Sequence, residues 1–392
     1  MNLNTLEIGL LAILIFCFII QLFYYWIVLA KPLYYMLSAN KRKVRIPDEL
    51  PPVSVIICLN DSNNDLFRFL SNILEQDYPK FEVIVVTDGN LEESEETLKL
   101  LKYQHSNLYS THIPENTKNI SRKKLALSLG IKAAKYDKLL FTEPDSVIAS
   151  KEWIYSMARH FSDEKTIVLG FSAVKNANSL SQKYMAYDYL FSNLQMISPA
   201  LFKYPYAGNG HNMAYTKEHF IEQKGFVKYR ILRQGEDDLF INEIASKNNT
   251  AVELSDKSVI LTETSDFHEW KNQKFDRMST KFFYKRGPVA FWRMETYIRI
   301  LFFAAFIACI IYGFPYKSIQ DFILPGVALS CFFIRFFSQL FIINKIVSKL
   351  RLGKFFMTII LFDLFQPFVN LYFFLYRILK DKENYIYHYD NR

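Results

Sequence analysis

Long apolar runs stand near both ends of the chain, and shorter apolar runs alternate with polar ones between them. Residues 6–30 form an apolar run with only Glu7 and Gln21 as strong polar interruptions. A helix of this length measures roughly 37 Å and can cross a hydrocarbon core about 30 Å thick. The run is too long for the apolar part of a signal peptide, so we interpret it as an uncleaved signal anchor.

Three more apolar runs follow later in the chain, at about 297–314, 322–343 and 355–379. The first two predict a hairpin of membrane helices. The third carries Asp363 and Gln366, so it either spans the membrane or lies partly in its interface. Arg335 stands inside the second run, where an arginine costs about 2.5–3.5 kcal/mol on insertion scales. This arginine either forms a buried pair with a neighbouring helix or lines a path for a lipid or glycan.

The middle of the chain has the periodicity of an α/β domain. Short apolar runs predict strands at 53–59, 81–86, 108–113 and 138–142, and helical spacing predicts helices at 67–74, 92–104 and 121–135. This alternation predicts right-handed crossovers and a mostly parallel sheet. We divide the chain into an anchor (1–31), the α/β domain (46–268), basic and aromatic interfacial helices (269–295), a C-terminal membrane region (296–380) and a polar tail (381–392).

The net charge of +8 is concentrated beside the apolar runs. Residues 31–45 hold five basic residues and no acid, residues 271–299 hold eight basic and two acidic residues, and residues 344–354 hold four basic residues and no acid. This positive-inside pattern predicts a multi-pass protein of the inner membrane with a cytoplasmic domain. A nucleic-acid-binding protein would carry its basic residues over a folded face, so we expect no nucleic-acid partner. The four cysteines have no metal-binding spacing and are expected to be structural thiols.

Polar residues follow several of the predicted strands. Asn60 follows the first, Asp88 the second, and Glu143 and Asp145 the fourth. Since ligands bind at the carboxyl ends of parallel strands, we expect these groups to share one cleft. Two carboxylates at i and i+2 can hold Mg²⁺ or Mn²⁺ against a diphosphate, although such a pair can also be a solvated turn. The chain has neither glycine-rich phosphate-loop motif, which argues against a dehydrogenase or a P-loop NTPase.

Seven short motifs occur in one order over residues 51–290. They are Val53–Ile57, Glu75–Pro79, Val85–Gly89, Arg122–Leu127, Thr142–Asp145, Gly208–Tyr215 and Gly235–Phe240. In this order and spacing the chain resembles the membrane-anchored family 2 glycosyltransferases. The resemblance implies a GT-A fold, which is Rossmann-like, with one N-terminal and two to three C-terminal transmembrane helices. It also implies transfer of a sugar, with inversion, from a nucleotide-diphosphate sugar, with UDP as the expected nucleotide.

The resemblance also implies roles for individual residues. The donor-binding residues are Asn60, Asp88, Lys123, Lys124, Glu143, Gln273 and Arg277; the metal ligands are Asp145 and Glu143; the acceptor-binding residues are Gly210, His211, Asn212 and Trp270. Within Glu236-Asp237-Asp238, the acid that fits the position of the general base is Asp237. The same three acids also suit the start of a helix, where its dipole favours negative charge.

Three departures from the family pattern leave alternatives open. The run Gln273 to Met278 places Arg277 one position late and lacks the tryptophan of the Gln-x-x-Arg-Trp motif, which weakens the interpretation as a processive polysaccharide synthase. Thr87 and Glu143 stand where many relatives have aspartate. We expect an enzyme that uses Mg²⁺ or Mn²⁺, a nucleotide-sugar, a lipid-linked or growing glycan and membrane lipid. A non-catalytic transferase-like subunit and a transporter are the rival classes.

Overall fold

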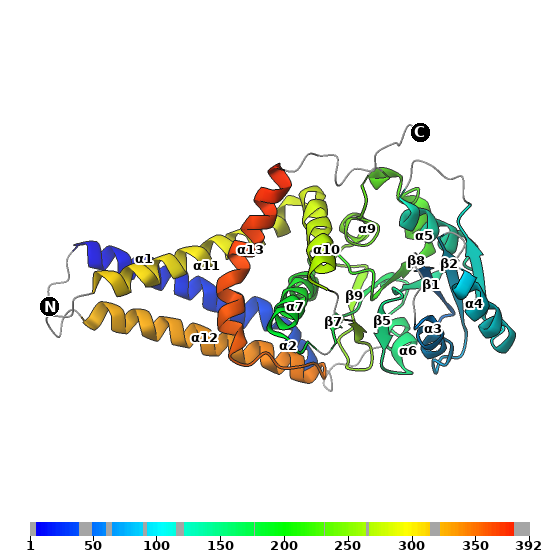
Figure 1. Cartoon of the computed structure of the whole chain (residues 1–392), viewed down its shortest axis with the longest axis horizontal. Coiled ribbons are helices and arrows are strands. Elements are labelled where there is room, and N and C mark those ends of the chain that lie inside the picture. The colour runs from blue at the N-terminus through cyan, green and yellow to red at the C-terminus, as the bar shows by residue number, and fades with distance from the viewer. Residues whose placement is uncertain are drawn as a thin grey trace.

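A computed structural model describes residues 5–38, 49–59, 65–88, 92–114, 121–175, 177–230, 232–263, 266–313 and 322–379. Long apolar helices extend from one end of an α/β domain (Figure 1). The expected fold class, an α/β domain joined to apolar helices near both ends of the chain, is confirmed.

A seven-stranded sheet forms the centre of the domain, in the order β3-β2-β1-β4-β8-β6-β9. The bounds are β1 Val53–Leu59, β2 Phe81–Thr87, β3 Leu108–His112, β4 Lys138–Phe141, β6 Ile167–Leu169, β8 Met213–Thr216 and β9 Thr250–Val252. Strand β1 pairs in parallel with β2 and β4, and β2 pairs in parallel with β3. Only β8 is antiparallel to its neighbours β4 and β6, so the sheet is mostly parallel as predicted.

Both faces of the first strand are covered, which explains its unbroken apolar sequence. All seven residues of β1 are buried. Val55 and Ile57 face one core together with α3 (Leu66–Leu74), whereas Ile56 and Cys58 face a second core together with α5 (Arg122–Ala133). Helix α4 (Glu92–Gln104) follows β2, as the sequence pattern predicts.

The second half of the domain contains short strands that the sequence pattern did not predict. A small sheet has the strand order β5-β10-β7, with β5 at Ser146–Ile148, β7 at Ser172–Val174 and β10 at Ile260–Thr262. The remaining helices are α6 Trp153–Ala158, α7 Leu180–Leu201, α8 Lys217–Glu222, η3 Val227–Tyr229, α9 Asp238–Ile244, α10 Phe267–Thr280 and η4 Lys281–Phe283. Helix α7 packs between the domain and the apolar helices. Its Tyr187 hydroxyl accepts a hydrogen bond from the Gln339 side chain at 3.0 Å.

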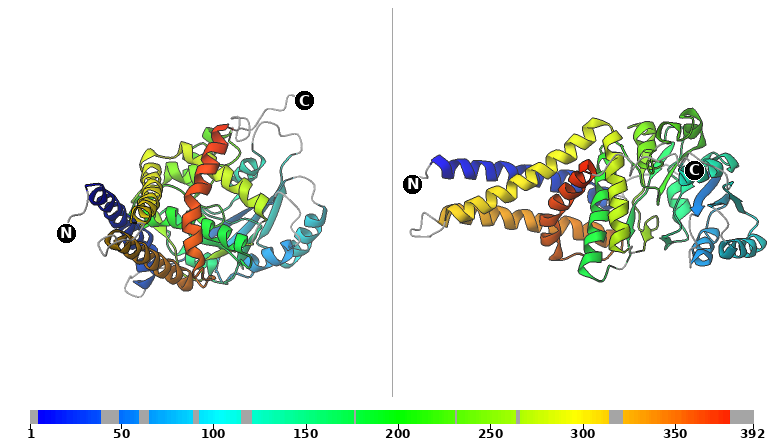
Figure 2. Two further views of the ribbon diagram at one scale, coloured as in Figure 1. Left: turned by 60° about the vertical axis from the view of Figure 1, so that its left-hand side comes forward. Right: turned by 45° about the horizontal axis from the view of Figure 1, so that its top comes forward.

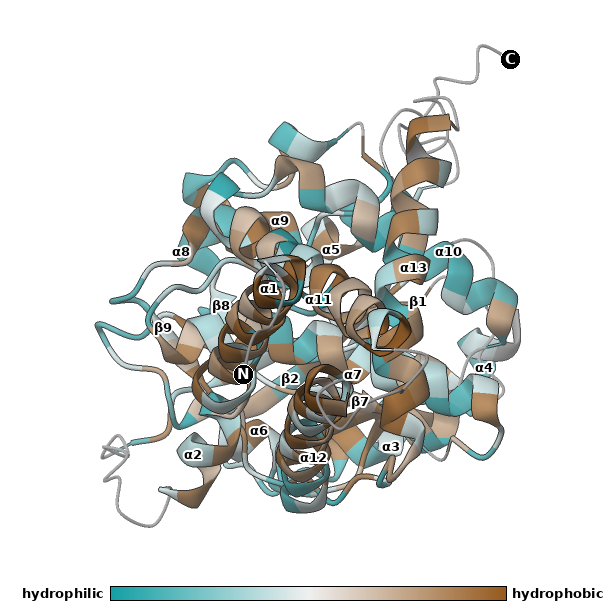
Figure 3. Ribbon diagram, turned by 90° about the vertical axis from the view of Figure 1, so that its left-hand side faces the viewer, coloured by the Kyte–Doolittle hydropathy of each residue, from teal (hydrophilic) through white to brown (hydrophobic). Residues whose placement is uncertain are grey.

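Among the residues that the structure describes, four helices are long and apolar enough to cross a membrane, at Thr5–Leu37, Arg286–Tyr312, Ile323–Lys349 and Thr358–Tyr376. The first consists of α1 (Thr5–Phe23), a π-helical stretch η1 (Tyr24–Leu29) and α2 (Lys31–Leu37). The others are α11 (Arg286–Tyr312), α12 (Ile323–Lys349) and α13 (Thr358–Leu379). Figure 3 shows hydrophobic residues over most of the length of α1, α11 and α12.

Helix α13 differs from the other three in direction. Helices α1, α11 and α12 lie side by side, whereas α13 crosses them steeply where they meet the α/β domain (Figures 1 and 2). Its aromatic residues contact α10, since Phe373 meets Trp270 edge to face and Tyr376 meets Phe275 in the same way. This arrangement favours the interfacial alternative for the last apolar run over a simple fourth span.

A buried ion cluster joins the apolar helices. The Asp363 carboxylate of α13 pairs with Arg335 of α12 at 2.7 Å and with Arg299 of α11 at 3.2 Å. Arg299 also pairs with Glu295 at 2.6 Å, and Arg335 donates a hydrogen bond to the side-chain oxygen of Gln21 at 3.0 Å. The interpretation of Arg335 as one member of a buried pair is therefore confirmed.

We expect loss of the central carboxylate to destabilise the protein more than loss of one complete ion pair. Asp363→Met leaves two buried arginines with Glu295 as their only acid among the described partners, which costs about 3–5 kcal/mol. Arg335→Met added to Asp363→Met leaves Arg299 paired with Glu295 and restores charge balance. Thermal unfolding of detergent-purified protein should place the double variant above the single one. A double variant that unfolds lower than Asp363→Met would contradict this account of the cluster.

Candidate active site

A cavity of about 750 Å³ opens at the carboxyl end of the parallel strands. Its floor includes Cys58 and Leu59 at the end of β1 and Glu143 to Asp145 after β4. Helix α10 forms one wall, and residues of α11 and α13 continue the lining toward the apolar helices. The expected cleft at the strand ends therefore extends to the helices that can enter a membrane.

Three side chains in this cavity can hold a cation. One ligand atom from each of Glu143, Asp145 and His211 lies within 4.8 Å of the others. The imidazole Nε2 of His211 lies 3.2 Å from the Asp145 carboxylate and 3.7 Å from the Glu143 carboxylate. Oxygen ligands suit both Mg²⁺ and Mn²⁺, whereas the added imidazole nitrogen favours a transition metal such as Mn²⁺. The residues thus fit the divalent metal that the sequence predicts, and His211 joins the two acids as a further ligand candidate.

A hydrogen-bond network orients His211. Its Nδ1 lies 3.0 Å from the side-chain oxygen of Asn209. The Asn209 amide nitrogen in turn donates to the hydroxyls of Ser172 and Tyr189, both at 2.9 Å. Burial disfavours the imidazolium, but Glu143 and other neighbours raise the pKa of His211 to about 10. This support directs Nε2 at the two carboxylates, as is usual for histidines at metal sites.

Lys123 connects the three candidate metal ligands to the acidic motif before α9. Its ammonium lies 2.9 Å from Glu143 and 3.0 Å from the buried Glu236. Burial opposes ionisation of Glu143, but His211, Lys123 and Arg277 lower the pKa of its carboxyl to about 2. Glu143 is therefore charged throughout the neutral range.

Asp237 faces the same cavity from the start of α9. Its Oδ2 accepts a hydrogen bond from the backbone N–H of Gly210 at 3.0 Å, and its Oδ1 accepts one from the N–H of Asp238 at 2.7 Å. A Cβ at Gly210 would lie 2.7 Å from a Glu143 oxygen and 3.4 Å from an Asp237 oxygen. Only glycine therefore allows both carboxylates to approach this stretch of backbone.

Asp238 is held differently from its neighbour. It is buried and accepts hydrogen bonds from the hydroxyls of Thr280 and of Tyr284, the latter at 2.6 Å. Burial and the adjacent Asp237 raise the pKa of Asp238 to about 7. Asp238 therefore ties α9 to the segment that leads into α11, and Asp237 is the acid with the more open position.

Two of the expected donor-binding residues have other partners. Lys124 is buried and points away from the cavity, donating to the backbone carbonyls of Leu232 and Gln234, the latter at 3.0 Å. It holds the loop before Glu236, so of the two lysines only Lys123 lines the cavity. Asp88 forms an ion pair with Arg122, which the sequence analysis did not single out as a site residue. Asn60 lies outside the described residues.

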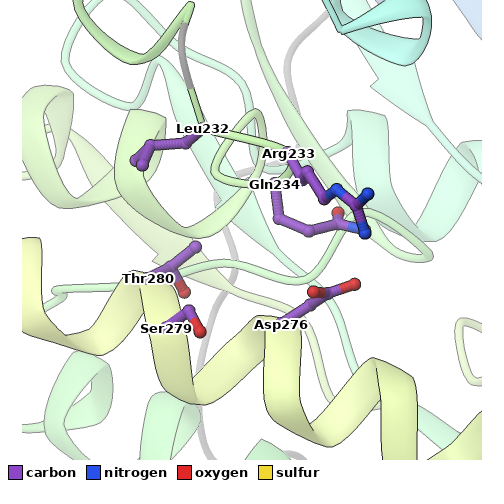
Figure 4. A pocket seen from close by; sticks show the side chains of 6 residues that line it. All are labelled: Leu232, Arg233, Gln234, Asp276, Ser279 and Thr280. Atoms are coloured by element: carbon purple, nitrogen blue, oxygen red, sulfur yellow. The ribbon is translucent and has the colours of Figure 1, made fainter. Parts of the chain in front are cut away.

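The loop held by Lys124 contacts α10 around a very small cavity. Leu232, Arg233 and Gln234 face Asp276, Ser279 and Thr280 across it (Figure 4). Its volume of about 10 Å³ is close to the space of one water, so no substrate fits there. The contact fixes the position of the acidic motif relative to α10.

The expected acceptor residues separate into two groups. Gly210, His211 and Trp270 line the cavity. Asn212 instead lies in the core, where its side chain accepts from the Trp153 indole at 3.1 Å and donates to the Phe171 and Ser258 carbonyls. Because all its polar atoms are bonded there, Asn212 positions the loop and does not face an acceptor.

Helix α10 presents the residues of the altered Gln-x-x-Arg-Trp run to the cavity. Arg277 lies over the Tyr189 ring at 4.7 Å, and Gln273 contacts Glu269 at 3.3 Å. Trp270 packs edge to face on Tyr184 and Phe373, so its ring is held in the wall. The late position of Arg277 in the sequence does not remove it from the site.

A family model described as glycosyl transferase family 2 matches residues 54–222. This range carries Glu143, Asp145 and His211, and it ends before Asp237.

Similar proteins are found among curated sequences and solved structures. The poly-beta-1,6-N-acetyl-D-glucosamine synthase of Staphylococcus aureus (strain MSSA476) is 26% identical over 171 residues, which are 42% of this chain and 40% of that protein. A mannosyltransferase from Pyrobaculum calidifontis in complex with GDP-Man and Mn²⁺ is 17% identical, with a TM-score of 0.49, over 86% of this chain and 99% of that one. Residues 1–349 of TarS from S. aureus, with UDP-GlcNAc, are 15% identical, with a TM-score of 0.40, over 76% and 73%. The chain therefore matches about two fifths of the length of the curated relatives.

Mn²⁺ binding should depend on the histidine support as well as on the ligands. Asp145→Asn removes a charged ligand candidate, and Asn209→Ala removes the partner of the His211 Nδ1. We expect each change to weaken Mn²⁺ binding about 10–100-fold. Titration of the purified protein with Mn²⁺, followed by electron paramagnetic resonance of the free ion, measures this. Asp163→Asn, an exposed control, should bind as the parent does. Unchanged affinity in Asp145→Asn would argue against a metal at this triad.

The raised pKa of Asp238 makes stability depend on pH. Because the folded carboxyl binds its proton more tightly than the unfolded one, its contribution to stability is lost as pH rises from 3.8 through about 7. Asp238→Asn removes this titration. The melting temperature of the parent should therefore fall more between pH 5 and pH 8 than that of the variant. Equal falls would show that Asp238 ionises freely in the folded protein.

Proposed function

We propose that this protein transfers a sugar from a UDP-sugar to a hydroxyl of a glycan acceptor. The premise is that residues 54–222 form a family 2 glycosyltransferase domain. One observation carries the proposal: Glu143, Asp145 and His211 meet Asp237 around Gly210 in one cavity. In an inverting transfer, a metal site serves the leaving diphosphate and a separate carboxylate serves as the base.

Asp237 acts as the general base in this proposal. As the acceptor oxygen bonds to the anomeric carbon, its proton passes to the Asp237 carboxylate. The bond between the anomeric carbon and the diphosphate oxygen breaks, and its electron pair leaves with the nucleoside diphosphate. The backbone N–H groups of Gly210 and Asp238 fix the direction of the carboxylate, so it is oriented before the acceptor arrives.

In this proposal the donor diphosphate lies between the three candidate metal ligands and α10. Glu143, Asp145 and His211 would hold a divalent metal, which supplies positive charge to the leaving diphosphate when bound. Arg277 contributes a second positive charge from the opposite wall, and Gln273 lies one turn before it. Asp88, whose carboxylate pairs with Arg122, recognises the nucleoside beyond the end of β2.

The membrane position follows from the charge pattern and the helices. We place the domain on the cytoplasmic side of the inner membrane, because basic residues cluster between it and the apolar helices. A processive polysaccharide synthase is the second candidate, and the similarity to a poly-N-acetylglucosamine synthase favours it. The Gln273 to Met278 run lacks a tryptophan that could stack on a growing chain, so we favour transfer of single sugars.

The proposal predicts metal-dependent turnover that needs Asp237. Detergent-purified full-length protein with a membrane lipid extract and Mg²⁺ or Mn²⁺ is given a panel of nucleotide-sugars, and released nucleoside diphosphate and lipid-bound sugar are both measured. Asp237→Asn keeps the shape of the side chain and removes the base, so transfer should fall about 10²–10⁴-fold.

Asp137→Asn is the matched control, since Asp137 is exposed and pairs only with Lys138 among its described side-chain partners. It should transfer sugar at the parental rate. Equal transfer rates in Asp237→Asn and in the parent would contradict the assignment of Asp237 as the general base. Nucleotide binding with metal but without turnover would favour the non-catalytic subunit.

A further inference from the structure

The cavity has a second part that the transfer of a sugar does not explain. Beyond the carboxylates, its lining continues along α11 with Tyr297 and Ile300 and along α13 with Leu371 and Phe374. These four side chains are apolar or aromatic, and the polar Thr296, Gln366 and Asn370 lie beside them in the lining. The outer surfaces of both helices are largely exposed apolar residues. The site of the chemistry is therefore continuous with a slot between two helices that belong to the membrane region.

Two cations line the cavity where it enters this slot. Lys281 begins η4, one turn after Arg277, and Arg293 lies in the first two turns of α11. Neither has an ion-pair partner within the part of the chain that the structure describes. Arg293 is exposed, and its guanidinium lies over the Phe282 ring at 5.8 Å.

The acids nearest to Lys281 are already bonded to other groups. Asp188 pairs with Lys274, and Asp238 accepts from Thr280 and Tyr284. Burial and the neighbouring cation Lys274 lower the pKa of Lys281 to about 8. A lysine placed in this way is stabilised by an anion that enters from the cavity, because such an anion supplies the charge that the protein does not.

We propose that Lys281 and Arg293 form a subsite for the phosphate of a lipid-linked acceptor, whose hydrocarbon chain lies between α11 and α13 and whose sugar reaches Asp237. The inference rests on the proposed function and specifies its acceptor class. The lining offers a group for each part of such a molecule: a carboxylate for the sugar hydroxyl, cations for the phosphate, and apolar side chains for the chain.

The phosphate remains unchanged in the reaction, so the subsite binds and positions the acceptor and takes no part in bond breaking. Phe282 of η4 stacks on Phe374 of α13 with ring centres 6.3 Å apart. This contact lies beside both cations and joins η4 to α13. An acceptor held there has its head group close to α10 and its chain directed at the membrane.

The test compares three probes that separate the features of this ligand. Geranylgeranyl diphosphate carries chain and phosphate, geranylgeraniol carries the chain alone, and inorganic pyrophosphate carries the charge alone. Each is titrated into the detergent-purified full chain, and intrinsic fluorescence reports binding because Trp270 and Trp292 line the cavity. We expect geranylgeranyl diphosphate to bind at least about tenfold more tightly than either other probe.

The variant pair is Lys281→Gln with Arg293→Gln, and its matched control is Lys285→Gln with Arg286→Gln. The control residues are equally basic and lie in the same segment, but they do not line the cavity. The first pair should weaken binding of geranylgeranyl diphosphate about tenfold or more, and the control should leave it within twofold.

Two results would overturn the proposal. Equal binding of geranylgeraniol and its diphosphate would show that the phosphate is not recognised, and pyrophosphate bound as tightly as the lipid would assign the cations to the donor alone. Release of nucleoside diphosphate by the parent is measured separately. Cation-dependent lipid binding without any nucleotide-sugar turnover would support the subsite and reject the proposed function, so the two failures are distinguishable.

Discussion

A single buried carboxylate, Asp363, holds three of the apolar helices together. It balances two arginines on two different helices, and a buried arginine without a partner is costly enough that α11, α12 and α13 cannot separate freely. Gln366, one turn further along α13, accepts a hydrogen bond from Arg299 at 2.8 Å and also lines the large cavity. The wall of the site and the packing of the apolar helices therefore depend on the same few charges.

The sequence predicted the first half of the domain well, because its strands are long and buried on both faces. The second half was not predicted in detail. Strands β5, β6, β7, β9 and β10 contain three residues each, too few for a period of two to be recognised. Their positions depend on pairing between residues far apart in sequence, such as Ile260 with Ser172, which one sequence does not reveal.

For the site, the sequence showed which residues follow a strand, but it did not show in which direction each side chain points. Glu143 and Asp145 were found because they follow β4 directly. Lys123 and Lys124 are adjacent, yet successive residues of a helix point about 100° apart, so one faces the cavity and the other a loop. The same limit applies to His211 and Asn212, of which only the first faces the cavity. The phosphate-binding role proposed for Lys281 could not be inferred from the sequence, where it is one of many basic residues beside the apolar runs.

The contacts of Asp238 connect the proposed base, Asp237, to the start of α11. Its hydroxyl partners, Thr280 and Tyr284, end α10 and precede α11, and the N–H of Lys285 bonds to Asn242 of the same helix α9 at 3.1 Å. Helix α11 begins immediately after this junction. Any tilt of α11 that matches its apolar length to the surrounding hydrocarbon is thus transmitted to α9 and to Asp237 at its start. The thickness of the lipid bilayer becomes a variable of the chemistry, alongside the concentrations of donor and acceptor.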